Sequence, residues 1–193
     1  MYQEFFQSLK SKVDFSEEDL AVIKKYLTPK KLRKKQYLLQ EGDVCKYVAF
    51  VEKGILKSYT IDEKGSEHII QFALEGWLIS DLYSFLTGEP ATYTIDAIED
   101  SELILIGQGA NEELLKILPR YETWIRFQIT GAYIALQKRL TSIISLPLDE
   151  RYQSLTSIYP DIVQRVPQHM IASYMGLTPE TLSRVRRKLT ARK

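Results

Sequence analysis

The spacing of apolar residues changes near Gly109, and this change limits the possible folds more than any other feature of the chain. From Gln36 to Ile106 the sequence consists of short segments rich in β-branched and aromatic residues, which is typical of β-strands. Beyond Gly109 apolar residues recur every third or fourth position, which is typical of helices. The absence of strand–helix alternation argues against a doubly wound parallel sheet. We therefore predict an α+β protein with its β-rich part first.

Glycines punctuate the β-rich segment at regular intervals, at Gly42, Gly54, Gly65 and Gly76. This spacing is typical of a sandwich, a jelly roll or a barrel.

Two features precede the β-rich segment. Residues 16–27 predict a short amphipathic helix with a capping-box start and its apolar face at positions 20, 23 and 27. The basic run at 30–35 could contact nucleic acid, but we interpret it as a solvated face leading into a strand.

A continuous apolar seam predicts one long helix over residues 120–145. Pro119 suits its first turn and Pro147 lies just beyond its end, so the helix would be about 39 Å long. Such a helix is longer than the core of a small domain, and its seam resembles a two-stranded coiled coil. We therefore expect a homodimer, the alternative being a helix packed along its own sheet. The seam consists of Ile125, Ile129, Ala132, Leu136, Leu140 and Ile143.

Residues 168–187 have the pattern of a helix-turn-helix. Ala172 lies where two helices must approach closely, and Gly176 lies in the turn, where a left-handed backbone favours glycine. Thr178 is the expected cap of the second helix, and Pro179 suits its first turn. The apolar contacts between the helices would come from Ile171, Met175, Leu177, Leu182 and Val185.

The outer face of the second helix carries the predicted DNA contacts. Arg184 can donate two hydrogen bonds to guanine, and Glu180 can accept one from cytosine. Thr181 and Ser183 can contact a base or a phosphate. The expected phosphate contacts, which position the protein without reading sequence, are Arg186, Arg187 and Lys188. The alternative is a structural helical hairpin with a solvated basic face.

Charge is distributed unevenly along a chain whose formal net charge is only +1. Residues 166–193 contain one acidic residue, Glu180, so this segment is strongly positive and the remainder is negative. A polyanion would therefore bind at the C-terminal end. The basic residues of this segment are Arg184, Arg186, Arg187, Lys188, Arg192 and Lys193.

The sequence resembles the Crp/Fnr family of transcription regulators over nearly its whole length. IASYMGLTPETLSRVRRKL (171–189) is similar to the recognition segment of that family, and 149–168 to the helix and connector before it. Residues 38–81 and IDAIEDSELILI (95–106) look like the β-roll of cyclic nucleotide-binding domains. The resemblance implies a double-stranded β-helix (jelly-roll-like) sensor over 1–109, a connecting and dimerisation helix over 110–146, and a DNA-binding domain over 147–193.

The sequence departs from the family at its phosphate-binding cassette, where a Gly-Glu pair binds ribose and an Arg followed by Ser or Thr binds the cyclic phosphate. Ser80-Asp81 stands in place of the first pair and Ala91-Thr92 in place of the second. Without the arginine the phosphate loses its bidentate partner. We therefore expect no cyclic AMP binding, and these four residues line either a repurposed pocket for an unknown small-molecule effector or an empty scaffold.

Cofactors and other activities find little support in the sequence. Cys45 alone cannot hold the cluster of the family's oxygen sensors, and His68 and His169, which could ligate haem iron, are expected to be structural. The single sensor histidine does not suit a cupin-like metal site, and no P-loop, nucleophile elbow or dinucleotide motif occurs, so we expect neither an enzyme nor a metal site.

The predicted function is that of a dimeric, sequence-specific, cytoplasmic DNA-binding regulator. Its expected partners are double-stranded DNA and a second copy of the chain, with RNA polymerase as a further candidate and no membrane. The alternative is a ligand-binding signalling module whose C-terminal helices bind a protein instead of DNA.

Overall fold

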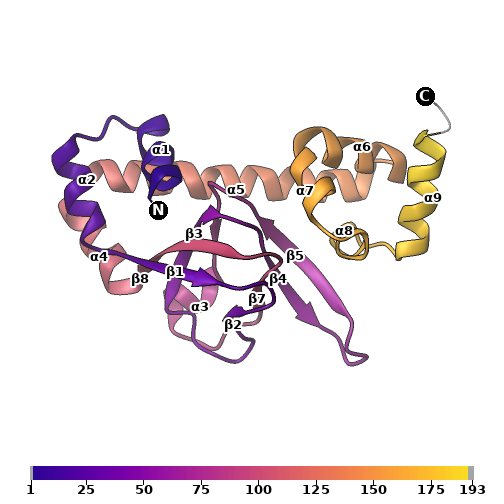
Figure 1. Cartoon of the computed structure of the whole chain (residues 1–193), viewed down its shortest axis with the longest axis horizontal. Helices are drawn as coiled ribbons and strands as arrows, with labels where there is room; N and C mark the ends of the chain where they lie inside the picture. Colours follow the sequence, from indigo (N-terminus) through magenta and orange to yellow (C-terminus); the bar gives the residue numbers. More distant parts are fainter. Residues whose placement is uncertain (1, 191–193) are drawn as a thin grey trace. The chain divides into compact units, whose positions relative to one another are not determined.

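The structure is a computed structural model that describes residues 2–190, and these form two compact units (Figure 1). The first unit comprises the residues up to 60 together with 70–130. The second comprises 61–69 and the residues from 131 onwards. The division therefore falls within the long helix α5 (Pro119–Ser145) and places the tip of a hairpin in the second unit. The expected domain division after residues 109 and 146 stays a prediction.

Two four-stranded sheets form the β-roll of the first unit. One sheet has the order β1-β8-β3-β6 and the other β2-β7-β4-β5, and the pairs with a described register are antiparallel. The roll confirms the predicted α+β fold with a jelly-roll-like sensor. Its strands are β1 (Leu27–Leu32), β2 (Tyr37–Leu39), β3 (Tyr47–Lys53), β4 (Leu56–Ile61), β5 (Glu67–Ala73), β6 (Leu78–Ile79), β7 (Thr94–Ala97) and β8 (Ser101–Gly107).

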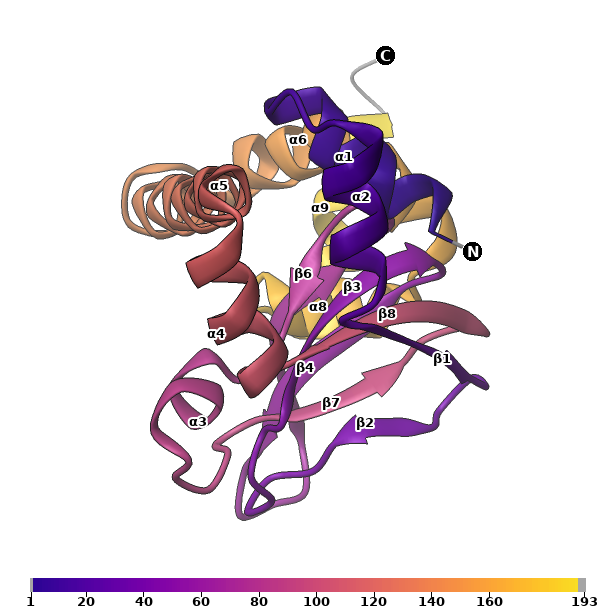
Figure 2. The same ribbon diagram turned by 90° about the vertical axis from the view of Figure 1, so that its left-hand side faces the viewer.

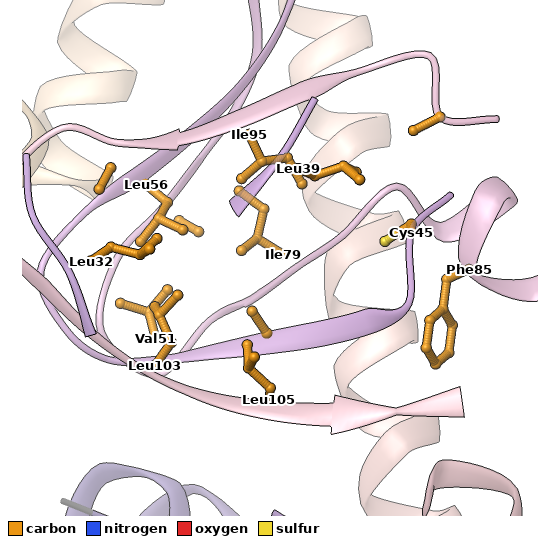
Figure 3. Close-up of a cluster of buried hydrophobic side chains, with 14 residues drawn as sticks. Leu32, Leu39, Cys45, Val51, Leu56, Ile79, Phe85, Ile95, Leu103 and Leu105 are labelled. Carbon is orange, nitrogen blue, oxygen red and sulfur yellow. The ribbon is translucent and has the colours of Figure 1, made fainter. Parts of the chain in front are cut away.

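The interior of the roll is apolar because alternate residues of each strand point inward. Figure 3 shows Val51, Leu103 and Leu105 from one sheet facing Leu56 and Ile95 from the other. Burial of these side chains supplies the main driving force for closing the roll.

The four glycines that punctuate the β-rich segment all have a positive φ, as their turns require. Gly54 is also constrained by space. A Cβ atom there would lie 2.8 Å from the Cα of Ser101, closer than a Cβ atom approaches a non-bonded backbone carbon. The turn between β3 and β4 therefore accepts only glycine.

Helices cover the outer face of the first sheet. These are α1 (Gln3–Lys12), α2 (Glu17–Lys24), α4 (Gln108–Ile117) and the first part of α5, and their side chains form a second core with Phe50 and Ile104 (Figure 2). The capping box at Ser16 is confirmed, with reciprocal bonds of 3.0 and 3.1 Å to Asp19. One detail of the prediction is wrong: the helix ends at Lys24, and Leu27 begins β1, where it pairs with Ile106.

The basic run at 30–35 lies in β1 and the turn that follows it. Lys31, Arg33, Lys34 and Lys35 are exposed, and the Lys31 ammonium lies 2.8 Å from a carboxylate oxygen of Glu102. The run is a solvated strand edge, as the sequence pattern indicated.

The second unit consists of the C-terminal part of α5 and the helices that follow it. They are α6 (Leu148–Ile158), α7 (Pro160–Arg165), α8 (Gln168–Tyr174) and α9 (Pro179–Thr190). The predicted long helix is confirmed and has 27 residues. Ser173 of α8 joins the hairpin tip to this unit, since its hydroxyl donates to Glu67 O (2.7 Å) and accepts from Ile69 N (3.0 Å). No helix within residues 2–190 is long and apolar enough to cross a bilayer.

Candidate nucleic-acid interface

The helix pair α8–α9 has the packing predicted for a helix-turn-helix. Gly176 has a φ of 69°, and its amide donates to Ser173 O at 2.9 Å, which closes the C-terminal turn of α8. The amide of Leu177 donates to Ala172 O at 2.9 Å. The buried contacts that hold the two helices together are Ile171, Ala172, Met175, Leu182 and Val185.

The first turn of α9 is organised by two threonines. The Thr178 hydroxyl accepts from the amide of Thr181 at 3.3 Å and donates to the Thr181 hydroxyl at 3.2 Å. Thr178 is thus the N-cap expected from the sequence. A hydrogen bond from its own backbone amide is the largest cause that lowers the pKa of Glu180, which is fully exposed at this helix end.

The outer face of α9 presents exposed basic and polar side chains. Arg184 donates from Nη2 to the Thr181 hydroxyl at 3.3 Å, so the capping threonines also hold the guanidinium of the predicted base-reading arginine. Glu180 and Ser183 are exposed beside it. Residues at positions 180, 183, 184 and 187 recur at helical spacing, and together they form a surface that a major groove can accept.

The predicted phosphate contacts differ in their surroundings. Arg186 and Arg187 are exposed, whereas the Lys188 ammonium lies 3.0 Å from a carboxylate oxygen of Asp149, at the start of α6. Lys188 thus already has a counter-charge within the second unit. No sequence signal singled out Asp149, because the pair joins residues 39 positions apart. The predicted basic residues Arg192 and Lys193 lie outside the described residues.

The seam of α5 is exposed along most of its length. Leu136 is 60% exposed, Leu140 57% and Ile129 51%, and Ala132 and Ile143 are also exposed. Ile125 differs, because it packs against the helical core of the first unit. A row of large apolar side chains left in water is characteristic of a surface that another molecule covers.

The cassette residues of the sensor bind one another. Asp81 is 1% exposed and caps α3 (Leu82–Thr87), with one carboxylate oxygen accepting from the amide of Ser84 at 3.0 Å. Its other oxygen accepts from the Thr92 amide (2.8 Å) and hydroxyl (3.1 Å). Ala91 is buried in the interior of the roll, and Ser80 is half-buried. Both oxygens of the carboxylate at the ribose-binding position are therefore used inside the cassette.

Two of the three residues considered for redox or metal chemistry, Cys45 and His68, have structural partners. Cys45 is buried, its thiol donates to Tyr47 O at 3.3 Å, and burial raises the pKa of this thiol. His68 contacts Asp62 at 2.9 Å in the hairpin tip, and His169 is exposed on α8. Within residues 2–190 no three His, Cys, Asp or Glu side chains are grouped so that they could hold a metal ion.

Comparison with protein families gives a match for the β-roll. Residues 29–117 match the family model of the cyclic nucleotide-binding domain. This range begins at the third residue of β1 and ends with α4, so it covers the rest of the β-roll and the cassette.

Relatives with a known role resemble nearly the whole chain. The fumarate and nitrate reduction regulatory protein of Vibrio cholerae is 26% identical over 81% of this chain and 66% of its own length. The regulatory protein HlyX of Actinobacillus pleuropneumoniae is 24% identical over 88% of this chain and 75% of its own. Both relatives are named as regulatory proteins. This chain thus spans about two thirds of the first relative.

The fold of the whole chain also has solved counterparts. FixK2 from Bradyrhizobium japonicum has a TM-score of 0.70 and 20% identity, covering 86% of this chain and 85% of its own. At this identity the likeness establishes the fold.

Proposed function

We propose that the chain is a member of the Crp/Fnr family of transcription regulators, which its similarity to the cyclic nucleotide-binding domain and to two bacterial regulatory proteins supports. It is a dimeric, sequence-specific DNA-binding protein that does not bind cyclic AMP. The observation that carries the proposal is the outer face of α9. It is exposed and basic, while the inner face of the same helix is buried at Leu182 and Val185. A helix held in this way can enter the major groove with its N-terminal residues against the bases.

The assignment of roles on α9 follows from chemistry and from the contacts of each side chain. Arg184 reads guanine, because a guanidinium matches the O6 and N7 acceptors of that base and the Thr181 hydroxyl already orients it. Glu180 accepts from a cytosine amino group, and its lowered pKa keeps the carboxylate ionised. Arg186 and Arg187 bind phosphates.

A second copy of the chain is the proposed cover of the α5 seam. The exposed residues Ile129, Leu136 and Leu140 recur at steps of seven and four, which is the spacing of a two-stranded coiled coil. Pairing two copies would place two recognition helices on successive major grooves about 34 Å apart. An effector of the sensor would act by turning α5 and so changing this separation.

The internal bonds of the cassette support the proposed lack of cyclic AMP binding. Asp81 would have to release Ser84 or Thr92 before it could accept a ribose hydroxyl. Ala91 offers no charge to the cyclic phosphate and is buried. Binding would thus lose the usual charge-assisted bonds and also break existing ones.

The test is selection of bound sequences from a pool of random DNA duplexes by the purified protein, with and without cyclic AMP. We expect enrichment of a two-fold symmetric motif that is independent of the nucleotide. Enrichment only with cyclic AMP would refute the cassette argument. Enrichment of no sequence under either condition would refute DNA reading and favour the protein-binding alternative.

The dependence of binding on salt separates DNA binding from an apolar protein interface. Neutralising several phosphates releases counterions, so the DNA affinity should fall steeply between about 50 and 200 mM salt. An interface with a protein partner through the helices of the second unit would change little over this range. A flat salt dependence would therefore contradict the proposed use of Arg186 and Arg187.

A further inference from the structure

Two arginines from different helices bind consecutive carbonyl groups at the end of α8. Arg139 of α5 donates from Nη2 to Tyr174 O at 2.7 Å, and Arg151 of α6 donates from Nη2 to Met175 O at 2.7 Å. Both arginines are half-buried. The turn that leads into α9 is thus held by α5 on one side and α6 on the other.

These contacts suit the chemistry of a helix end. The last carbonyls of a helix have no partner within it and carry partial negative charge, so a cationic donor is favourable there. Hydrogen bonds from a charged donor are about twice as strong as neutral ones. The Arg139 guanidinium also lies 3.9 Å from the centre of the Tyr174 ring, a cation–π contact that fixes its orientation.

The two guanidinium groups are kept close together despite their equal charge. Burial, and the nearby charge of Arg139, lower the pKa of Arg151 from its ordinary value. An arrangement that holds like charges together has a cost, which the bonds to the two carbonyls must offset. Two arginines that served only to keep the surface soluble would instead extend away from each other into solvent.

Arg139 is also part of the helix that carries the exposed seam. It lies one turn from Leu136 and one turn from Ile143, so the same stretch of α5 bears both the seam and the bond to the α8–α9 turn. A turn of α5 would therefore be transmitted directly to the start of the recognition helix.

We propose that Arg139 and Arg151 are positioning residues that hold the α8–α9 turn in a set orientation to α5 and so determine the separation of the two recognition helices in the dimer. This inference rests on the proposed DNA-binding function and adds to it the contacts that select the spacing of half-sites. The arginines contact no DNA themselves.

The experiment compares Arg139→Gln with Lys138→Gln. Lys138 is exposed on the same helix, so the control removes the same charge without touching α8. The probes are the symmetric duplex selected by the wild-type protein, versions of it with one base pair added or removed between the half-sites, and a duplex with a single half-site. Circular dichroism and thermal unfolding verify that each variant is folded.

We expect Arg139→Gln to bind the symmetric duplex about tenfold more weakly, as the loss of one charge-assisted bond would imply, and to lose its preference among spacings. Its affinity for the single half-site should change less than about twofold, because α9 itself is intact. Arg139→Lys, which keeps one charged donor, should recover part of the preference. Lys138→Gln should behave as wild type.

Three results would overturn the inference. An equal loss on the half-site and the symmetric duplex would make Arg139 a purely stabilising residue. If Arg139→Gln kept the wild-type preference among spacings, Arg139 would have no positioning role. Failure of the wild-type protein to enrich any sequence would instead refute the proposed function, and the positioning role with it.

Discussion

At the scale of single residues, Arg184 is the proposed base-reading residue, and Arg186 and Arg187 are the proposed phosphate contacts. Arg184 donates a hydrogen bond to Thr181, whereas Arg187 is exposed. Lys188 differs from both because its charge is engaged by Asp149. Arg187 is therefore a better probe of phosphate contacts than Lys188.

Replacing Arg184 with Ala should weaken binding to the selected duplex by about 1–3 kcal/mol and relax the base preference at one position of each half-site. Arg187→Ala should weaken binding to selected and random duplexes alike. Fluorescence anisotropy titrations of both duplexes measure these effects. Equal losses on the two duplexes for Arg184→Ala would contradict its assignment as a base-reading residue.

A buried ion pair in the β-roll is a second point at which one side chain has a large effect. Lys57 is 3% exposed, lies opposite Asp96 in the register of β4 and β7, and has its ammonium 3.8 Å from that carboxylate and 4.0 Å from the Tyr59 ring centre. Removing the cation alone leaves a buried carboxylate without its counter-charge.

We expect Lys57→Met to lower the free energy of unfolding by about 3 kcal/mol, measured by urea denaturation. The double variant Lys57→Met/Asp96→Leu should recover most of this loss, because neither charge of the pair then stays buried. If the double variant were as unstable as the single one, the loss would come from packing and not from the unpaired charge.

At the scale of elements, the long helix α5 contributes to both units and carries the largest row of exposed apolar side chains. Leu136→Glu should convert the proposed dimer into a monomer, because a charge would be buried in the seam. Sedimentation velocity measures the change. Leu86→Glu in α3 is a matched control, since Leu86 is 61% exposed and lies outside the seam. A dimer that withstands Leu136→Glu would show that another surface pairs the two copies.

The elements also differ in how readily a sequence pattern predicts them. The 27-residue α5 and the helix-turn-helix were predicted because several turns of apolar spacing, with prolines or glycine at the ends, repeat the same signal. The six-residue α3 and the two-residue β6 are too short to have a period. The apolar pattern does not indicate β1, which overlaps the basic run, because only Leu27 and Leu32 of its six residues are buried.

At the scale of the whole molecule, a sensor joined to a DNA-binding unit should respond to whatever the sensor binds. Cyclic AMP at 1 mM should leave the thermal unfolding temperature of the protein unchanged. A ligand at about one hundred times its Kd would stabilise the folded state by about 2.7 kcal/mol, which shifts this temperature by several degrees. Differential scanning calorimetry measures it, and a shift of that size would contradict the interpretation of Asp81 and Ala91.

The amino-acid sequence by itself determined the features that depend on neighbouring residues. The capping box at Ser16, the left-handed turns at the punctuating glycines, the extent of α5 and the faces of α9 all follow from local backbone geometry and from the periods of helix and strand. The resemblance of residues 171–189 to a known recognition segment added the interpretation of the outer face.

Only the tertiary structure decided which distant side chains meet. Asp81 with Thr92, Lys188 with Asp149, and Arg139 with the carbonyl of Tyr174 are joined by folding and lie 11, 39 and 35 positions apart. A periodic pattern specifies which face of an element is buried, but it carries no information about what the polar residues of that face contact. Those contacts depend on how the elements pack. They determine whether the polar side chains of the cassette are available to a ligand or are hydrogen-bonded to one another.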